Sequence, residues 1–418
     1  MFFVSNMNKK ANIPLQSYTS SLRGRQKVFA GLSGGVDSSV AAALLKEQGF
    51  DVTGIHLKCF NLDGCAERDA DDARRVAETL NIPFYVFDFE NEYKDRVVNY
   101  MVGGYRRGIT PNPDVMCNKE IKFGLFMRRA RELGADYIAT GHYVRLIKYN
   151  ISKDVIVRNP AAGGLGGFDI LWSGATSKPR RREDKRSPPL ERTERVEDHY
   201  IFALKTAKDV NKDQSYFLWT LTQEQLKYCL FPIGDYKKSA VRAMAKQYGL
   251  PTAEKKDSQG ICFLGKVKLA NFLKQYIPAR AGVIMTAEGK KIGAHDGAHA
   301  YTPGQRHGLY VGGMKHPVYV TSTDITENTV TVAERDPATE TKMIALANVN
   351  IIGAQPKKET PVMARIRYRE PLAPARLIHQ FNGKYILMFA APRQFIAPGQ
   401  SAVFYTHTGE MIGGGIIV

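Results

Sequence analysis

Two patterns of hydrophobic and polar positions alternate between about residue 27 and residue 250. Short apolar runs predict buried strands, and longer segments with apolar residues three and four positions apart predict helices. The predicted strands are 28–30, 51–57, 82–89 and 135–140, and the predicted helices are 40–46, 69–80, 93–105, 123–133, 223–229 and 237–248. Strands and helices that alternate at this spacing are typical of a doubly wound parallel sheet. The predicted class is therefore α/β.

The pattern changes after Gly282, where helices become scarce and short β-rich runs are separated by turn residues. The clearest predicted strands there are 317–320, 330–332, 363–369, 385–389 and 401–405. Alternation of this kind is typical of a small barrel or sandwich. In the run 363–369, Arg365, Arg367 and Arg369 share one predicted face, and such a row of guanidinium groups would suit contacts with phosphates.

Residues 150–199 fit neither pattern. A glycine-rich stretch, 161–167, precedes a charged and proline-broken stretch, 178–189. We expect a mobile insert. The predicted division is a flexible basic tail (1–26), an α/β domain that contains the insert (27–265), a central β-rich domain (266–342) and a C-terminal β-barrel (343–418).

The net charge of the chain indicates which class of partner it binds. A formal net charge of +18 over 418 residues, with a pI near 9.5, is typical of proteins that bind a polyanion. Part of the excess of basic residues lies in the insert and the tail, so the alternative is a basic surface that binds no polyanion.

The five cysteines are an odd number without a Cys-x-x-Cys pair, which indicates reduced thiols inside a cell and no metal site. No stretch reaches the roughly 18 apolar residues of a spanning helix, so we expect a cytoplasmic protein without membrane contact. The N-terminal tail carries no acidic residue and several basic ones, among them Lys9, Lys10, Arg23 and Arg25. A mitochondrial transit peptide is therefore the alternative to an ordinary tail.

Candidate chemistry begins between the first predicted strand and helix, in Gly31-Leu32-Ser33-Gly34-Gly35-Val36-Asp37-Ser38. Adjacent glycines let backbone N–H groups surround a phosphate, the serine hydroxyls add donors, and the following helix directs its positive end at the anion. No Gly-Lys-Ser/Thr follows, so this is not a Walker loop. The pattern Ser-Gly-Gly-x-Asp-Ser resembles the PP-loop of the N-type ATP pyrophosphatases. Asp37 would repel a bare triphosphate, so we expect it to act through Mg²⁺ or to orient the pyrophosphate.

A second candidate site follows two prolines, in Thr110-Pro111-Asn112-Pro113-Asp114-Val115-Met116-Cys117. The prolines favour an extended loop, which places Asp114 and Cys117 where a helix starts. The helix dipole, Lys119 and Lys122 would favour a thiolate at Cys117, and the Asp114 carboxyl could exchange a proton. The alternative is structural, with Asp114 as a helix cap and Cys117 as a small buried residue.

Taken together, the motifs resemble one family, the tRNA-specific 2-thiouridylases of the MnmA/TrmU type. The resemblance runs in order from about Lys27 to Val418, without the insert. The motifs that carry it are Ser-Gly-Gly-Val-Asp-Ser-Ser, Thr-Pro-Asn-Pro-Asp-x-x-Cys-Asn, Ala-Thr-Gly-His-Tyr, Lys-Asp-Gln-Ser-Tyr-Phe-Leu, Gly-Ile-Cys-Phe, Tyr-Thr-Pro-Gly-Gln-Arg and Ala-Pro-Gly-Gln-Ser-Ala-Val-Phe-Tyr.

The resemblance implies a PP-loop domain, a small central β-rich domain and a C-terminal β-barrel that helps to hold tRNA. It also implies a reaction, in which ATP adenylates the C2 oxygen of the wobble uridine of tRNAs for Lys, Glu and Gln, and a persulfide sulfur then displaces AMP. Cys262 would carry the persulfide received from a sulfur donor protein, Cys117 would resolve the intermediate through a disulfide with Cys262, and Asp114 would act as acid or base. We expect ATP and Mg²⁺ as cofactors and a monomeric protein.

Further site residues follow from the same resemblance, position by position. ATP would contact Gly31, Leu32, Ser33, Gly34, Gly35, Val36, Asp37, Ser38, Leu57 and Gly141. The tRNA would contact Asn112, Pro113, Asp114, His142, Lys212, Asp213, Gln214, Arg367, Tyr368 and Gln400. Leu57 departs from the family, which often has Met there, so its contact would be made by backbone or generic apolar atoms.

Three other interpretations stay open at this point. Another PP-loop synthetase would use a nitrogen nucleophile to displace the adenylated oxygen and would not need Cys117 or Cys262. A tRNA-binding protein could keep the fold without the chemistry. An iron–sulfur cluster held by Asp114, Cys117 and Cys262 is the third, because three ligands with an open position are a known arrangement.

Overall fold

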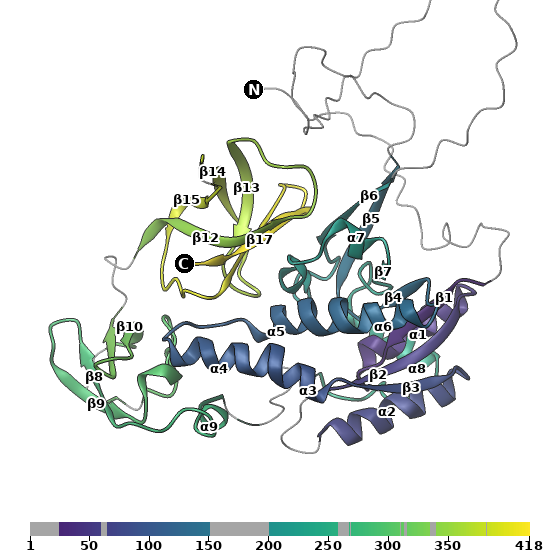
Figure 1. The fold of residues 1–418 in the computed structure, drawn as a ribbon, viewed down its shortest axis with the longest axis horizontal. Coiled ribbons are helices and arrows are strands. Elements are labelled where there is room, and N and C mark those ends of the chain that lie inside the picture. The colour runs from purple at the N-terminus through teal and green to yellow at the C-terminus, as the bar shows by residue number, and fades with distance from the viewer. Residues whose placement is uncertain are drawn as a thin grey trace, which may run out of the picture.

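The computed structural model describes residues 25–59, 65–150, 200–257, 267, 269–309, 311–312, 316–334, 340–381 and 383–418. The N-terminal part is built on a five-stranded parallel sheet with the order β3-β2-β1-β4-β7 (Figure 1). Its strands are β1 (Lys27–Gly31), β2 (Asp51–Lys58), β3 (Phe84–Asp88), β4 (Tyr137–Ala139) and β7 (Cys229–Leu230). The predicted doubly wound α/β sheet is confirmed.

Helices cover both faces of this sheet because its strands are apolar on both sides. On one face, Val28 and Val52 pack with α1 (Val36–Glu47), α2 (Cys65–Thr79) and α8 (Lys238–Gln247). On the other face, Ile55 and Ile138 pack with two long helices. The first runs through α3 (Glu90–Tyr93), η2 (Lys94–Val98) and α4 (Asn99–Arg106), and the second through α5 (Pro113–Met116), η3 (Cys117–Phe126) and α6 (Met127–Glu132).

The remaining elements of this part connect the sheet to its surroundings. A hairpin formed by β5 (Val144–Asn150) and β6 (Tyr200–Thr206) flanks the predicted insert, which lies outside the described residues. The short helices η4 (Ser215–Leu218) and α7 (Gln223–Leu226) follow. The helix predicted over 223–229 is wrong at its end, since Cys229 pairs as a strand with Ile138 of the parallel sheet.

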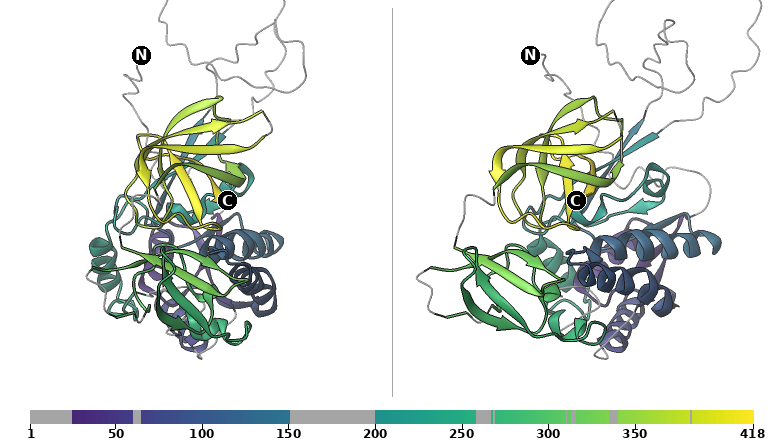
Figure 2. Two further views of the ribbon diagram at one scale, coloured as in Figure 1. Left: turned by 90° about the vertical axis from the view of Figure 1, so that its left-hand side faces the viewer. Right: turned by 60° about the vertical axis from the view of Figure 1, so that its left-hand side comes forward.

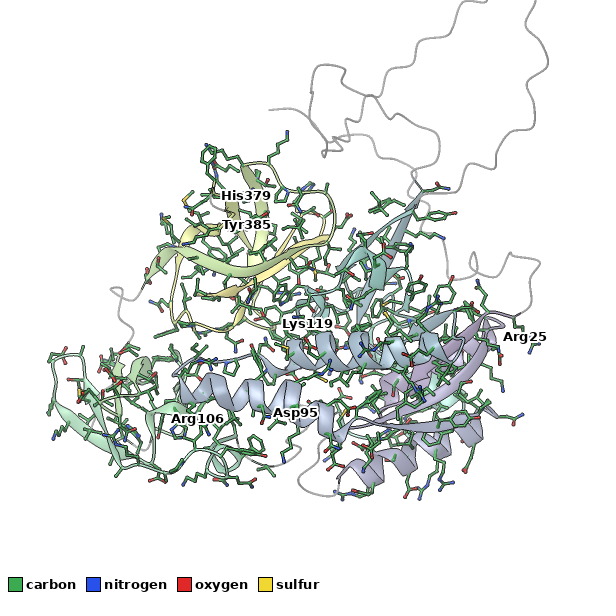
Figure 3. The ribbon with its side chains drawn as sticks, in the orientation of Figure 1. Arg25, Asp95, Arg106, Lys119, His379 and Tyr385 are labelled. Carbon is green, nitrogen blue, oxygen red and sulfur yellow. The ribbon has the colours of Figure 1, made fainter. Side chains whose placement is uncertain are left out.

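The middle part begins with α9 (Leu269–Leu273) and contains a four-stranded mixed sheet, β10-β11-β8-β9. Its elements are β8 (Gly282–Thr286), β9 (Lys291–His295), η5 (Ala298–Ala300), β10 (Tyr319–Asp324) and β11 (Thr329–Ala333). Alternate residues such as Ile284, Val320 and Val330 form its core. Arg106, at the end of α4, donates to the carbonyl of Tyr276 at 2.8 Å and so joins the two parts (Figure 3).

The C-terminal part is a closed antiparallel barrel with the order β12-β15-β14-β13-β16-β17, as the alternating pattern predicts. Its strands are β12 (Thr341–Ile351), β13 (Glu359–Arg365), β14 (Ala373–His379), β15 (Tyr385–Arg393), β16 (Ser401–Tyr405) and β17 (Met411–Ile417). Closure leaves the sheet without a free edge. The barrel stands beside the parallel-sheet part and above the middle sheet (Figures 1 and 2).

The predicted row of arginines on one strand face is wrong. Strand β13 ends at Arg365, and Arg369 has left-handed backbone, with φ of 64°, in the turn that follows. Arg367 is exposed and donates to the carbonyl of Phe395, whereas the Arg365 side chain is buried inside the molecule. The three guanidinium groups therefore do not form one surface.

Arg365 instead joins the barrel to the sheet domain through a buried polar cluster. Its Nη2 group forms an ion pair with Asp213 and donates to Ser215 Oγ at 3.0 Å and Tyr405 Oη at 2.8 Å. The side chains of Arg365 and Asp213 are only 6% and 2% exposed, so each charge depends on the other for compensation. Nearby, Trp219 Nε1 donates to Ser401 Oγ at 3.0 Å across the same interface.

We predict that Arg365→Met strongly destabilises this interface, because it leaves the Asp213 carboxylate buried without its cation. Loss of one partner of a buried ion pair costs about 3–5 kcal/mol of unfolding free energy. The chain has two tryptophans, and Trp219 lies at this interface. The variants are therefore made in a Trp172→Phe background, in which the fluorescence comes from Trp219 alone. Urea unfolding followed by its fluorescence measures the change.

The matched control is Arg376→Met, which breaks the exposed ion pair with Glu359 in the same barrel. Exposed pairs contribute about 1 kcal/mol or less, so the urea midpoint should hardly move. Equal midpoints for the Arg365 and Arg376 variants would show that the buried cluster does not hold the interface together.

Candidate active site

The glycine-rich loop between β1 and α1 is closed by its own serines. Ser33 N donates to Ser38 Oγ at 3.1 Å, and the Ser38 and Ser39 hydroxyls both donate to the Gly35 carbonyl, at 3.1 and 2.8 Å. Gly34 has φ of +69°, and a Cβ there would lie 2.3 Å from the backbone oxygen of Asp69. The loop thus needs glycine at this position. Its geometry is that of an anion-binding turn at a helix N-terminus.

Gly141 lies against the same loop. A Cβ at this position would come within 2.6 Å of Ser38 N, so the backbone after β4 approaches the first turn of α1 closely, next to the paired strands β1 and β4. The C-terminal ends of neighbouring strands in such a sheet form the usual ligand crevice. The structure therefore brings the predicted ATP residues 31–38 and Gly141 together.

Leu57, the other predicted ATP residue, lies near the end of β2 and is half-buried. Its neighbour His56 was not predicted from the sequence, and it is buried behind the loop with Nδ1 2.9 Å from the carbonyl oxygen of Leu32. Burial lowers the pKa of His56, which keeps the imidazole neutral. It supports the loop from the core side.

Asp37 is bound by side chains from two distant parts of the chain. Its Oδ1 atom accepts a 2.7 Å hydrogen bond from Tyr143 Oη, and both carboxylate oxygens lie 2.8 Å from Lys238 Nζ. Burial and the Asp37 charge raise the pKa of Tyr143, so its phenol stays a donor. Two residues distant in sequence therefore fix the orientation of this carboxylate.

Lys238 connects Asp37 to a second carboxylate, Asp257. Asp257 accepts from Lys238 at 2.8 Å, from Lys212 at 2.5 Å and from Arg242 at 2.8 Å. Burial acts to raise the pKa of Asp257, but the bonds from Lys212 and Lys238 outweigh it and lower that pKa. Cys262 lies five positions further along, outside the described residues, so its predicted pairing with Cys117 stays a prediction.

The second predicted site is a helix start that the barrel holds in place. Asn112 caps α5, with its Oδ1 accepting from Val115 N at 3.2 Å, so the cap is Asn112 and not Asp114. Gln400 of the barrel donates from Nε2 to the carbonyls of Thr110 and Pro111, at 3.2 and 3.1 Å. The barrel therefore holds the segment that leads into the helix carrying Asp114 and Cys117.

Cys117 lies on the first turns of this helix, as predicted, but its thiolate is not favoured. The side chain is buried, and desolvation raises the pKa of the thiol more than the nearby Lys122 lowers it. Asp114 raises it further. The expectation from the dipole and the lysines is therefore wrong for this conformation, because burial is the larger effect.

Several predicted tRNA residues have structural partners instead of a free surface. His142 is 8% exposed, with Nδ1 2.8 Å from Thr140 Oγ1 and its ring centroid 5.9 Å from that of Phe123. Burial lowers the pKa of His142 well below its usual value. Asp213 pairs with Arg365, and Gln214 Oε1 accepts from Tyr143 N at 3.0 Å. In this conformation His142 and Asp213 present little surface to RNA.

Other predicted tRNA residues lie near the helix start. The Tyr368 ring lies 4.4 Å from the Phe217 ring, and the Phe217 carbonyl is 3.5 Å from Asn118 Nδ2. The exposed Lys119, whose Nζ lies 3.6 Å from Glu120 Oε1, is on the part of η3 near the barrel (Figure 3). Tyr368 and Gln400 are thus gathered around residues 112–118.

Family models match three successive parts of the chain. The tRNA methyl transferase HUP domain matches residues 26–161 and 190–266, the tRNA methyl transferase PRC-barrel domain matches 270–334, and the aminomethyltransferase beta-barrel domain matches 341–417. The chain is 38% identical to the tRNA-specific 2-thiouridylase MnmA of Christiangramia forsetii, over 94% of this chain and 100% of that protein. It is 40% identical to MnmA of Geobacillus thermodenitrificans over 94% of each. The chain belongs to the MnmA family of tRNA-specific 2-thiouridylases.

Among solved structures, NMN synthetase from Francisella tularensis matches with a TM-score of 0.33 and 16% identity over 61% of this chain and 74% of that one. That likeness is too slight to bear on function. No helix in the described part of this MnmA-family chain is long and apolar enough to cross a membrane.

Besides His56, sequence reasoning missed the two residues that bind Asp37 in this MnmA-family chain. Tyr143 follows Gly141 and His142 directly, so its position after β4 was a usable signal. Lys238 had no local signal, because it stands 201 positions after Asp37 in an ordinary helix pattern. Only the fold brings these two side chains together.

We predict that Cys117 reacts slowly with iodoacetamide in the RNA-free protein. Because burial raises the thiol pKa, the reactive thiolate is scarce at neutral pH, and the rate should still be rising at pH 9. Mass spectrometry of the peptide that contains Cys117 measures the rate. In urea, where the thiol returns to its ordinary pKa of about 8.5, modification should be faster at pH 7. Faster modification in the folded protein would contradict the burial effect.

Proposed function

We propose that this chain is an ATP-dependent tRNA-uridine 2-sulfurtransferase, which converts the wobble uridine of tRNA to 2-thiouridine. The observation that carries the proposal is the similarity to 2-thiouridylases across nearly the whole chain. The glycine-rich loop supports it, because a loop of this geometry binds the phosphates of a nucleotide. The net charge of +18 supports a polyanionic substrate.

In the first step, residues 31–38, Leu57 and Gly141 bind ATP, and the C2 oxygen of uridine attacks the α-phosphorus. The bond from this phosphorus to the bridging oxygen breaks, and pyrophosphate leaves with the electron pair. The base now carries AMP on its C2 oxygen, which turns an unreactive oxygen into a leaving group. Asn112, Pro113 and Asp114 contact the base, which must be turned out of its stack to reach them.

Mg²⁺ is the second proposed cofactor. It binds carboxylate and phosphate oxygens, and Asp37 offers a carboxylate at the loop. Asp37 would hold the ion once Lys238 has moved away from its oxygens. The ion would neutralise charge on the leaving pyrophosphate.

In the second step, the terminal sulfur of a persulfide on Cys262 attacks C2, and AMP leaves with the former C2 oxygen. The Cys117 thiolate then attacks Sγ of Cys262. The sulfur–sulfur bond of the adduct breaks, its electron pair goes to the sulfur on C2, and a Cys117–Cys262 disulfide forms. A thiol reductant must restore both cysteines before the next turnover.

The distance between the glycine-rich loop and Cys117 is compatible with a reaction whose two steps take place at these two positions. Phe126 packs beside Gly31 of the loop, and Cys117 lies nine residues earlier on the same helix. This segment is a π-helix, which rises less per residue than the 1.5 Å of an α-helix, so the separation is below about 14 Å along the helix axis. A nucleotide bound at the loop can span such a distance toward a base at the helix start.

The remaining parts of the proposal concern partners. A persulfide-carrying donor protein transfers sulfur to Cys262. The tRNA is held by the barrel together with Lys212, Arg367, Tyr368 and Gln400. The protein acts as a monomer in the cytoplasm. The catalytic domain comprises residues 27–265, the central domain 266–342 and the barrel domain 343–418.

We predict that Cys262→Ser abolishes 2-thiouridine formation and leaves tRNA binding and pyrophosphate release intact, because it removes only the sulfur carrier. The measurement is mass spectrometry of the wobble nucleoside after incubation with tRNA, ATP, Mg²⁺ and a persulfide source. Pyrophosphate is assayed in the same reaction.

Asp37→Ala is the comparison, since it should abolish pyrophosphate and AMP formation as well. The two variants separate the nucleotide step from the sulfur step. Thiolation that persists in either variant would contradict the proposed mechanism. Loss of tRNA binding in the Cys262 variant would point to a structural role for that residue.

A further inference from the structure

The glycine-rich loop has no cation of its own. Residues 31–39 contain no lysine or arginine, although a polyphosphate bound there needs its charge balanced. Lys238, from α8, places an ammonium group at the loop, 2.8 Å from both oxygens of Asp37 and 2.8 Å from Asp257 Oδ1. Its side chain is only 12% exposed, and in the nucleotide-free protein these ion pairs hold its ammonium group at the loop.

Helix stability does not explain a lysine at this position. Lys238 is the first residue of α8, where the positive end of the helix dipole disfavours a cation, and the first turn contains no acidic residue. Its backbone N–H is satisfied by Asp209 Oδ2 at 2.8 Å, which involves no part of its side chain. A residue placed against local preference in a candidate site points to a functional reason.

The carboxylates around Lys238 do not depend on it equally. Asp257 is also bound by Lys212 and Arg242, so it stays paired when Lys238 moves. Asp37 has the phenol of Tyr143, which keeps its orientation. The ammonium can therefore leave Asp37 without leaving a buried carboxylate unpartnered. Of the three cations around Asp257, Lys238 is the one with a contact to the loop.

We propose that Lys238 is the pyrophosphate-binding cation of the loop. In the nucleotide-free protein it neutralises Asp37, and when ATP binds it moves onto the β- and γ-phosphates while Asp37 becomes available to Mg²⁺. This inference rests on the proposed function, because it deepens the assignment of the loop to ATP. It supplies the cation that a Walker loop carries within its own sequence.

The test is calorimetric titration of the full chain, in Mg²⁺ and without tRNA, with ATP, pyrophosphate and AMP. In Lys238→Met, the affinity for ATP and for pyrophosphate should fall by about tenfold or more, because a charge-assisted contact is lost. The affinity for AMP, which lacks the β- and γ-phosphates, should change by less than about twofold. Lys238→Arg should recover part of the loss.

Lys246→Met is the matched control, since it removes an exposed lysine from the same helix and should alter none of the three affinities. Lys238→Gln is a second variant of similar size, for use if Lys238→Met fails to fold in a thermal melt. Unchanged ATP and pyrophosphate affinities in the folded variants would overturn the inference and leave the proposed function standing. A native protein that binds no ATP would overturn both.

Discussion

The carboxylate of Asp37 is the point at which the nucleotide loop depends on the rest of the fold. The loop closes on itself through Ser33, Ser38 and Gly35, but these bonds do not orient Asp37. Tyr143 and Lys238 do so, from beyond β4 and from the start of α8. A charged side chain held by two distant residues is preorganised, so less reorientation is needed during a reaction.

The same contacts extend from the loop to the barrel. Tyr143 exchanges hydrogen bonds with Gln214, through Tyr143 N to Gln214 Oε1 and Gln214 N to Tyr143 O, and the adjacent Asp213 forms the buried ion pair with Arg365. Gln400 from the barrel holds the loop before Asn112. The barrel is thus a structural component of both candidate sites. For a tRNA-modifying enzyme, this arrangement puts the element proposed to hold RNA in contact with the segment proposed to bind the base, and residues 213–214 and Tyr143 connect it to the glycine-rich loop.

Much of this architecture could be predicted from the sequence, because local patterns determine local structure. The apolar run at Val28 and the helical periodicity after Val36 give β1 and α1, and the prolines around Asn112 give the helix start. These features depend on residues close together in the chain, and the hydrophobic periodicity is a property of such residues.

The errors have a common cause, since each depends on residues far away in the chain. A strand pattern through Arg369 could not show that β13 ends at Arg365, which turns inward to meet Asp213. The sequence shows lysines near Cys117, which act to lower the pKa of its thiol. Burial in the surrounding core raises that pKa and is the larger effect. Lys238 could not be assigned to the loop without the fold, and Cys262 lies outside the described residues.

The central claim is that ATP activates the C2 oxygen of one uridine so that sulfur can replace it. The most direct measurement uses tRNA with oxygen-18 at C2 of the wobble uridine, incubated with the protein, ATP, Mg²⁺ and a persulfide source, followed by mass spectrometry of the AMP produced. The account predicts that each AMP carries one oxygen-18 atom in its phosphate, in step with the 2-thiouridine formed. Unlabelled AMP accompanied by 2-thiouridine would contradict it, because the C2 oxygen would then have left by another route.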